Sequence, residues 1–172
     1  MINLDLNKSI RKQRLKFKFS PIVIIDLLLD IFIWIILLVV FFLVFVSKDN
    51  YSNHNSIIII IIYYIITIWV LCGFWFKNKL VKITGYDLES NRKKIIQLFN
   101  EKFPDLKLDD SDKQVLLFTK SVGLFNWGKT ITVIFVNDII YINWTTLGRH
   151  DFKSPLHAPF NYYKLIQIMK EF

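Results

Sequence analysis

The sequence predicts an α+β protein in which a two-helix transmembrane hairpin precedes a small cytosolic domain of helix, three- to four-stranded antiparallel sheet and helix. Two long apolar runs lie in the first half of the chain, and amphipathic helical and strand-like patterns fill the second half. The boundaries that we expect are a basic cytosolic arm at 1–18, the hairpin at 19–76 and a cytosolic α+β domain at 85–172.

The two apolar runs predict the membrane spans. Between residues 19 and 46 the only charged side chains are Asp26 and Asp30, and the twenty residues at 57–76 carry no charge. Twenty helical residues cover about 30 Å, which is the thickness of the hydrocarbon core of a bilayer. A short polar loop joins the runs, so we expect antiparallel spans at 19–46 and 57–76.

Lysine and arginine flank both spans and predict their orientation. Three cations follow the second span, one lies in the loop, and six precede the first span, namely Lys8, Arg11, Lys12, Arg14, Lys16 and Lys18. Because cations are enriched on the cytoplasmic side, both termini are expected in the cytoplasm at an inner or plasma membrane. The six cations of the arm are also candidate contacts for anionic lipid, the alternative being that they only set the topology.

Asp26 and Asp30 are candidate intramembrane acidic residues. Their spacing of four places them on one helix face. Counting along an antiparallel hairpin puts Asp26 level with Lys77, its candidate ion-pair partner, and Asp30 level with Gly73, about 6 Å deeper. Either both carboxylates are interfacial, or Asp30 is buried against a partner helix or an ion path.

The second half predicts a helix, a sheet and a closing helix. Apolar residues recur at helical spacing from Leu88 to Phe103, which predicts a helix at 88–103. Strand-like runs follow at 114–120, 129–136 and 138–146. Asn137-Asp138 between the last two runs tolerates the positive φ of a tight hairpin turn. Pro159 lies near the start of the closing helix.

This order of elements resembles a known group of membrane proteins. Two apolar runs, Trp127, the 130–144 hairpin, Pro155 or Pro159 and a final helix are similar to bacterial two-helix membrane proteins with a small cytosolic PH-like domain. The resemblance implies a binding or scaffolding role and brings no catalytic residues. Trp127 and Trp144 are candidate partner contacts, with packing in the core as the alternative.

No motif in the sequence predicts catalysis, a metal or a cofactor. The stretch at 123–130 matches the letters of a phosphate-binding loop but leads into a strand-like run instead of a helix. His150, Asp151 and His157 are close in sequence but lack a third ligand at suitable spacing. We therefore expect a protein that is not an enzyme and has no catalytic, metal or cofactor-binding residues.

Two functional hypotheses follow. The first is a membrane-anchored interaction or regulatory protein, with an immunity-type protein as one form, whose cytosolic domain binds a protein partner or the membrane surface. The alternative is a small oligomeric channel or transport subunit that assembles around Asp30. The expected partners are the membrane, anionic lipid at the basic arm, and a protein partner or a second copy of the chain. Nucleic acid is not expected, because residues 85–172 carry twelve cations against ten carboxylates.

Overall fold

The computed structural model describes residues 4–18, 21–43, 54–123, 126–148 and 153–172. The chain forms two compact units. The first comprises residues 1–18 and 73–172, and the second comprises residues 19–72.

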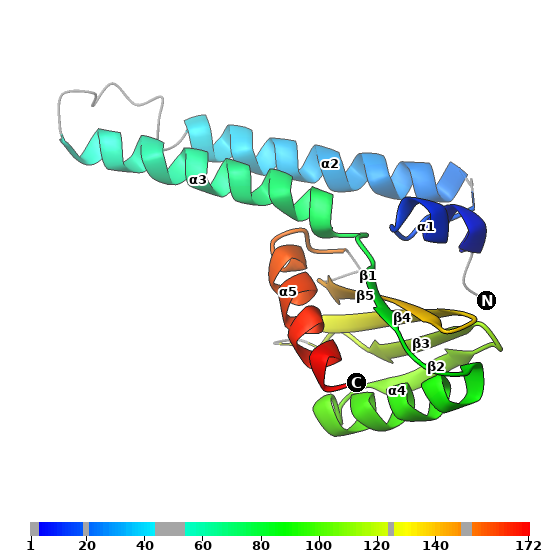
Figure 1. Cartoon of the computed structure of the whole chain (residues 1–172). Helices are drawn as coiled ribbons and strands as arrows, with labels where there is room; N and C mark the ends of the chain where they lie inside the picture. The colour runs from blue at the N-terminus through cyan, green and yellow to red at the C-terminus, as the bar shows by residue number, and fades with distance from the viewer. Residues whose placement is uncertain (1–3, 19–20, 44–53, 124–125, 149–152) are drawn as a thin grey trace. The chain divides into compact units, whose positions relative to one another are not determined.

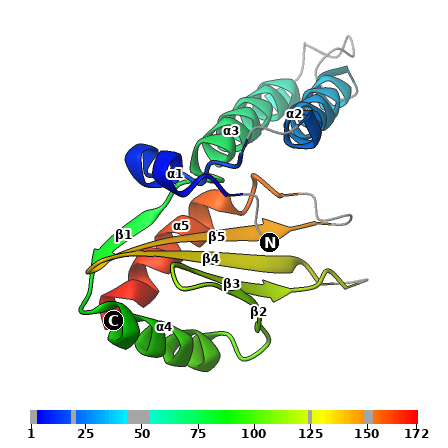
Figure 2. The same ribbon diagram turned by 90° about the vertical axis from the view of Figure 1, so that its right-hand side faces the viewer.

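The first unit is built on a five-stranded antiparallel sheet with the order β1-β5-β4-β3-β2 (Figure 2). Its strands are β1 (Val81–Thr84), β2 (Lys107–Ser111), β3 (Val115–Lys120), β4 (Gly128–Val136) and β5 (Ile139–Leu147). The longest pair is the β4–β5 hairpin, in which Val136 lies opposite Ile139 and Gly128 opposite Leu147. Asn137 adopts a φ of 53° in the two-residue turn, which confirms the predicted tight hairpin.

Two helices cover one face of the sheet, α4 (Leu88–Lys102) and α5 (Ala158–Ile168) (Figure 1). The Asp87 side chain caps α4 by accepting a hydrogen bond from the Ser90 backbone N–H. The main core lies between the helices and the sheet and includes Ile95, Phe99, Phe118, Ile131, Val133, Phe135, Ile140, Ile142 and Leu165. The predicted helix at 88–103 and the predicted closing helix are confirmed.

The opposite face of the sheet is covered by the N-terminal segment. Helix α1 (Leu6–Lys12) and the residues around it contribute Leu4, Ile10, Leu15 and Phe17 to a second apolar cluster. The sheet contributes Ile134 and Tyr141 to the same cluster. Residues 4–18 are therefore a folded layer of the first unit.

The second unit is a pair of helices, α2 (Pro21–Phe41) and α3 (His54–Phe76), whose last residues, 73–76, belong to the first unit. The two helices run side by side, and the Phe42 and Tyr63 rings meet with their centroids 5.7 Å apart (Figure 1). Large apolar side chains are exposed along both helices, including Phe32, Ile35, Leu37, Leu43, Ile61, Ile65, Ile68 and Leu71.

The predicted transmembrane hairpin at 19–46 and 57–76 is wrong, and so are the labels of integral membrane protein and transmembrane helix. Across the described ranges, no helix is both long enough and apolar enough to cross a membrane.

The predicted count of three to four strands is also wrong. Strands β1 and β2 form the two edges of the sheet and carry little sequence signal. β1 has four residues, VKIT, and β2 reads KLDDS, which lacks the apolar alternation of a half-buried strand. The VKIT segment of β1 is too short to stand out in the sequence, whereas in β2 the pairing with β3 overrides a low strand propensity.

Candidate functional site

The basic arm is held in a fixed place by hydrogen bonds to the segment that follows α3. The Asp5 side chain caps α1 by accepting from the Lys8 backbone N–H at 3.0 Å. Leu15 N donates to the Asn78 carbonyl at 2.7 Å, and Leu80 N donates to the Gln13 carbonyl at 3.0 Å. The cations of the arm therefore belong to a folded segment with a defined backbone position.

Arg14 joins the arm to an exposed tryptophan. Gln13 ends α1 with a φ of 48°, in the left-handed region, and Arg14 follows directly. The Arg14 Nη2 donates to the Trp75 carbonyl at 2.7 Å, and its guanidinium carbon lies 4.8 Å from the centroid of the Trp75 ring. A guanidinium over an indole face is a favourable cation–π contact. The Trp75 side chain remains accessible, because the residue is 63% exposed.

An aromatic belt adjoins this contact and consists of Trp75, Phe76, Tyr162 and Tyr163. The Phe76 ring centroid lies 5.1 Å from that of Tyr162 and 5.8 Å from that of Tyr163. The Lys79 ammonium lies 5.0 Å from the Phe76 centroid and 4.6 Å from the Tyr162 centroid. Tyr163 is 59% exposed. Trp75 and Tyr163 are thus the exposed rings of the belt, and Phe76 and Tyr162 are half-buried beside Lys79.

The charge of the basic arm is strongly one-sided. Residues 1–18 contain six lysines and arginines and one carboxylate, Asp5. Asp5 also forms an ion pair with Lys8 at 3.4 Å. The hydrogen bond from the Lys8 backbone N–H holds the pKa of Asp5 below its usual value, with desolvation acting in the opposite direction. Lys8, Arg11, Lys12, Lys16 and Lys18 are exposed, so the arm presents a cationic surface to solvent.

Asn143 anchors the segment that follows α3, a role that no sequence pattern indicated. Its side-chain amide nitrogen donates to the carbonyls of Lys79 at 2.9 Å and Lys77 at 3.3 Å. The Thr145 hydroxyl donates to the side-chain oxygen Oδ1 of Asn143 at 2.8 Å. Asn143 is buried in β5, and these bonds tie the segment after α3 to the sheet.

The predicted ion pair between Asp26 and Lys77 stays a prediction. The backbones of Asp26 and Asp30 lie in α2, but their side chains lie outside the described part of the structure. Lys77 is 5% exposed, and its ammonium lies 5.6 Å from the centroid of the Phe74 ring.

The two candidate tryptophans have different environments. Trp144 is 7% exposed and packs against Phe103, with ring centroids 4.9 Å apart. Trp127 is 49% exposed, and its ring centroid lies 4.8 Å from that of His157. Trp144 is a core residue, whereas the Trp127 side chain remains accessible to a partner.

His157 precedes α5, and its Nδ1 lies 3.0 Å from the Ser154 hydroxyl. Burial lowers the pKa of the imidazole below its ordinary value. His150 and Asp151 lie outside the described residues. Within the described residues, no group of three His, Cys, Asp or Glu side chains is placed to hold a metal ion.

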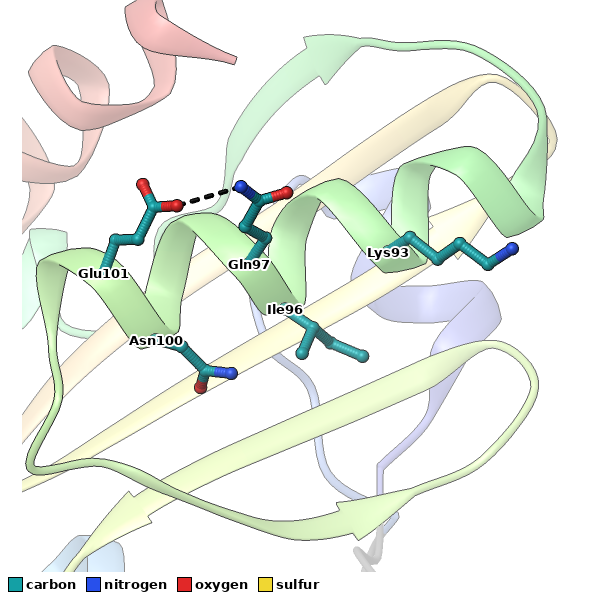
Figure 3. Close-up of a pocket in the computed structure, with 5 residues that line it drawn as sticks. All are labelled: Lys93, Ile96, Gln97, Asn100 and Glu101. Atoms are coloured by element: carbon teal, nitrogen blue, oxygen red, sulfur yellow. Dashed lines mark hydrogen bonds between the residues drawn. The ribbon is translucent and has the colours of Figure 1, made fainter.

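A shallow hollow on the outer surface of α4 is lined by Lys93, Ile96, Gln97, Asn100 and Glu101 (Figure 3). Figure 3 shows these side chains spread along a single helix, with Gln97 donating to Glu101 at 2.9 Å. The backbone of α4 has no free hydrogen-bonding groups here, because the helix uses them itself. The side chains of the hollow carry both signs of charge, so the hollow does not favour either anionic or cationic ligands.

Comparisons with protein-family models, curated proteins and solved structures give no match for this chain. The cations of the arm were predicted from the sequence, but Trp75, which Arg14 contacts, was not. The run GFWFKNK at 73–79, with aromatic residues next to lysines, is the signal that would have indicated the belt.

Proposed function

We propose that this chain is an interaction or regulatory protein that binds the surface of an anionic membrane through its basic arm and aromatic belt. We assign it to the cytoplasmic face of an inner or plasma membrane, where anionic lipids give the surface a negative potential. The observation that carries the proposal is the contact of Arg14 with the exposed Trp75, which joins the cationic arm to the belt.

The two parts of this surface suit two layers of a membrane interface. Tryptophan and tyrosine favour the headgroup region, because their rings are apolar and their N–H or O–H groups remain hydrated. Each lysine or arginine near an anionic surface contributes about 1 kcal/mol of attraction. The exposed apolar side chains of α2 and α3 support the same partner, because apolar surfaces of this extent mark contacts with lipid or protein.

The channel hypothesis has no observation in its favour. It required a transmembrane hairpin and a buried Asp30, and the hairpin is contradicted. The Asp30 side chain lies outside the described residues.

The proposal is tested by co-sedimentation of the full chain with vesicles of phosphatidylglycerol or of phosphatidylcholine. We expect binding to the anionic vesicles that weakens as salt is raised, because exposed charges are screened. Trp75→Ala is expected to weaken binding about tenfold, since insertion of one large ring contributes roughly 1.5–3 kcal/mol when fully buried. The matched control is Trp127→Ala, which removes an exposed tryptophan outside the belt.

Equal binding to both vesicle types, or equal losses for Trp75→Ala and Trp127→Ala, contradicts the proposal. The first result removes the electrostatic part, and the second removes the role of the belt.

A further inference from the structure

The two edges of the sheet differ in how open they are to pairing. At the β2 edge the pairing with β3 shifts register between Leu108 and Asp110, and the strand carries two adjacent aspartates. Such irregularities and charges discourage another strand from adding. At the β1 edge the register with β5 is regular from Val81 to Thr84. Figure 2 shows β1 at one end of the sheet, and in the described chain no strand pairs with its outer edge.

A groove runs between β1 and the helical segment at the C-terminus. It is lined by Val81, Lys82 and Ile83 of β1 and by Tyr162, Ile166, Met169 and Lys170 of α5 and the 3₁₀ turn η3 (Met169–Glu171). The lining is apolar apart from the two lysines and the tyrosine hydroxyl, and it contains no carboxylate. Lys82 and Lys170 are both exposed.

We propose that this groove binds an extended segment of a partner protein, in which apolar residues alternate with aspartate or glutamate, as an added strand on β1. The outer edge of β1 supplies backbone donors and acceptors, which give affinity in strand addition. Ile166 and Met169 offer apolar contacts to alternate side chains of the segment, because side chains of a strand point to opposite faces. Lys82 points to the face of β1 opposite Val81 and Ile83, where the carboxylates of such a segment also point, and pairs with them.

This inference rests on the proposed function only in treating the chain as an interaction protein. It assigns to that protein a binding edge and a class of partner. The groove and the membrane-binding surface use different lysines, so each claim is testable without the other.

The test uses the full chain in mild detergent and a fluorescent peptide of about ten residues that alternates valine with glutamate. Fluorescence anisotropy is expected to show saturable binding. Two control peptides are the valine–lysine analogue, which reverses the charge, and a backbone N-methylated valine–glutamate peptide, which cannot donate strand hydrogen bonds. Neither control is expected to bind.

Lys82→Gln is expected to bind the peptide about threefold more weakly, because it removes one exposed ion pair. Lys107→Gln, which removes an exposed lysine of the opposite edge strand β2, is the matched control and is expected to bind as the wild type does. Equal binding of the N-methylated peptide, or an unchanged affinity in Lys82→Gln, overturns the inference.

Vesicle binding is measured in parallel on the wild-type chain. A chain that binds anionic vesicles but not the peptide overturns the strand-addition site alone. A chain that binds the peptide but not vesicles supports the site and overturns the proposed membrane attachment.

Discussion

At the scale of single residues, hydrogen bonds of Asn143 and Arg14 hold the basic arm and the segment after α3 in place. Asn143 holds two backbone carbonyls of the segment after α3, and Arg14 holds the carbonyl of Trp75 within that helix. A polar side chain buried in a strand costs free energy unless it is hydrogen-bonded, and Asn143 is satisfied by partners more than sixty residues away. A sequence pattern cannot predict such partners, because they depend on the tertiary fold.

Asn143→Ala is expected to lower the free energy of unfolding by about 1–3 kcal/mol, since it leaves buried carbonyls unsatisfied. Urea denaturation measures the change. Asn100→Ala, an exposed asparagine on α4, is the control and is expected to change stability by less than about 0.5 kcal/mol. Similar losses in the two variants would show that Asn143 does not support the segment after α3.

His157 gives the protein a predicted pH dependence. Burial lowers the pKa of its imidazole in the folded chain, so the unfolded chain binds the proton more tightly. The contribution of this residue to stability is therefore complete above the unfolded pKa of about 6.5 and is lost as the pH falls below it. The urea midpoint of the wild type is expected to drop between about pH 7.5 and pH 5.5 more than that of His157→Gln. A drop of the same size in both proteins would exclude His157 as its cause.

At the scale of elements, the end of α3 is built to fit against the loop before α5. A Cβ added at Gly73 would lie 2.2 Å from the Pro155 carbonyl oxygen, so this helix position requires glycine. The close approach holds Phe76 beside Tyr162 and Tyr163. Some elements of the first unit were predictable from the sequence and others were not. Periodicity and turn residues predicted the helix at 88–103 and the 129–146 hairpin, whereas the edge strands β1 and β2 were not predicted.

Gly73→Ala is expected to destabilise the protein by about 1–3 kcal/mol through overpacking, although alanine is the better helix former. Gly123→Ala provides the control, because its added Cβ would have no neighbour closer than 3.6 Å. Thermal unfolding of both variants measures the difference. A Gly73→Ala protein as stable as Gly123→Ala would contradict the tight packing of α3 on the loop.

At the scale of the whole molecule, the sequence predicted the cationic arm but not its structure. Cations and apolar residues alternate at 8–18, which indicated a surface for anionic lipid. In the structure the apolar residues of this segment, Ile10, Leu15 and Phe17, pack on the second face of the sheet. The transmembrane prediction from the two apolar runs was wrong, because no helix in the described part of the chain is both long enough and apolar enough to cross a membrane.

The vesicle affinity of the triple variant Arg11→Gln/Lys12→Gln/Lys16→Gln tests whether the basic arm binds the chain to an anionic membrane surface. All three cations are exposed, and their loss is expected to reduce binding to phosphatidylglycerol vesicles about a hundredfold, at about 1 kcal/mol for each. Lys93→Gln/Lys107→Gln/Lys113→Gln removes the same charge from exposed positions on and beyond α4 and is expected to bind almost as the wild type does. Equal losses in the two triple variants, or no loss in the first, would contradict the account.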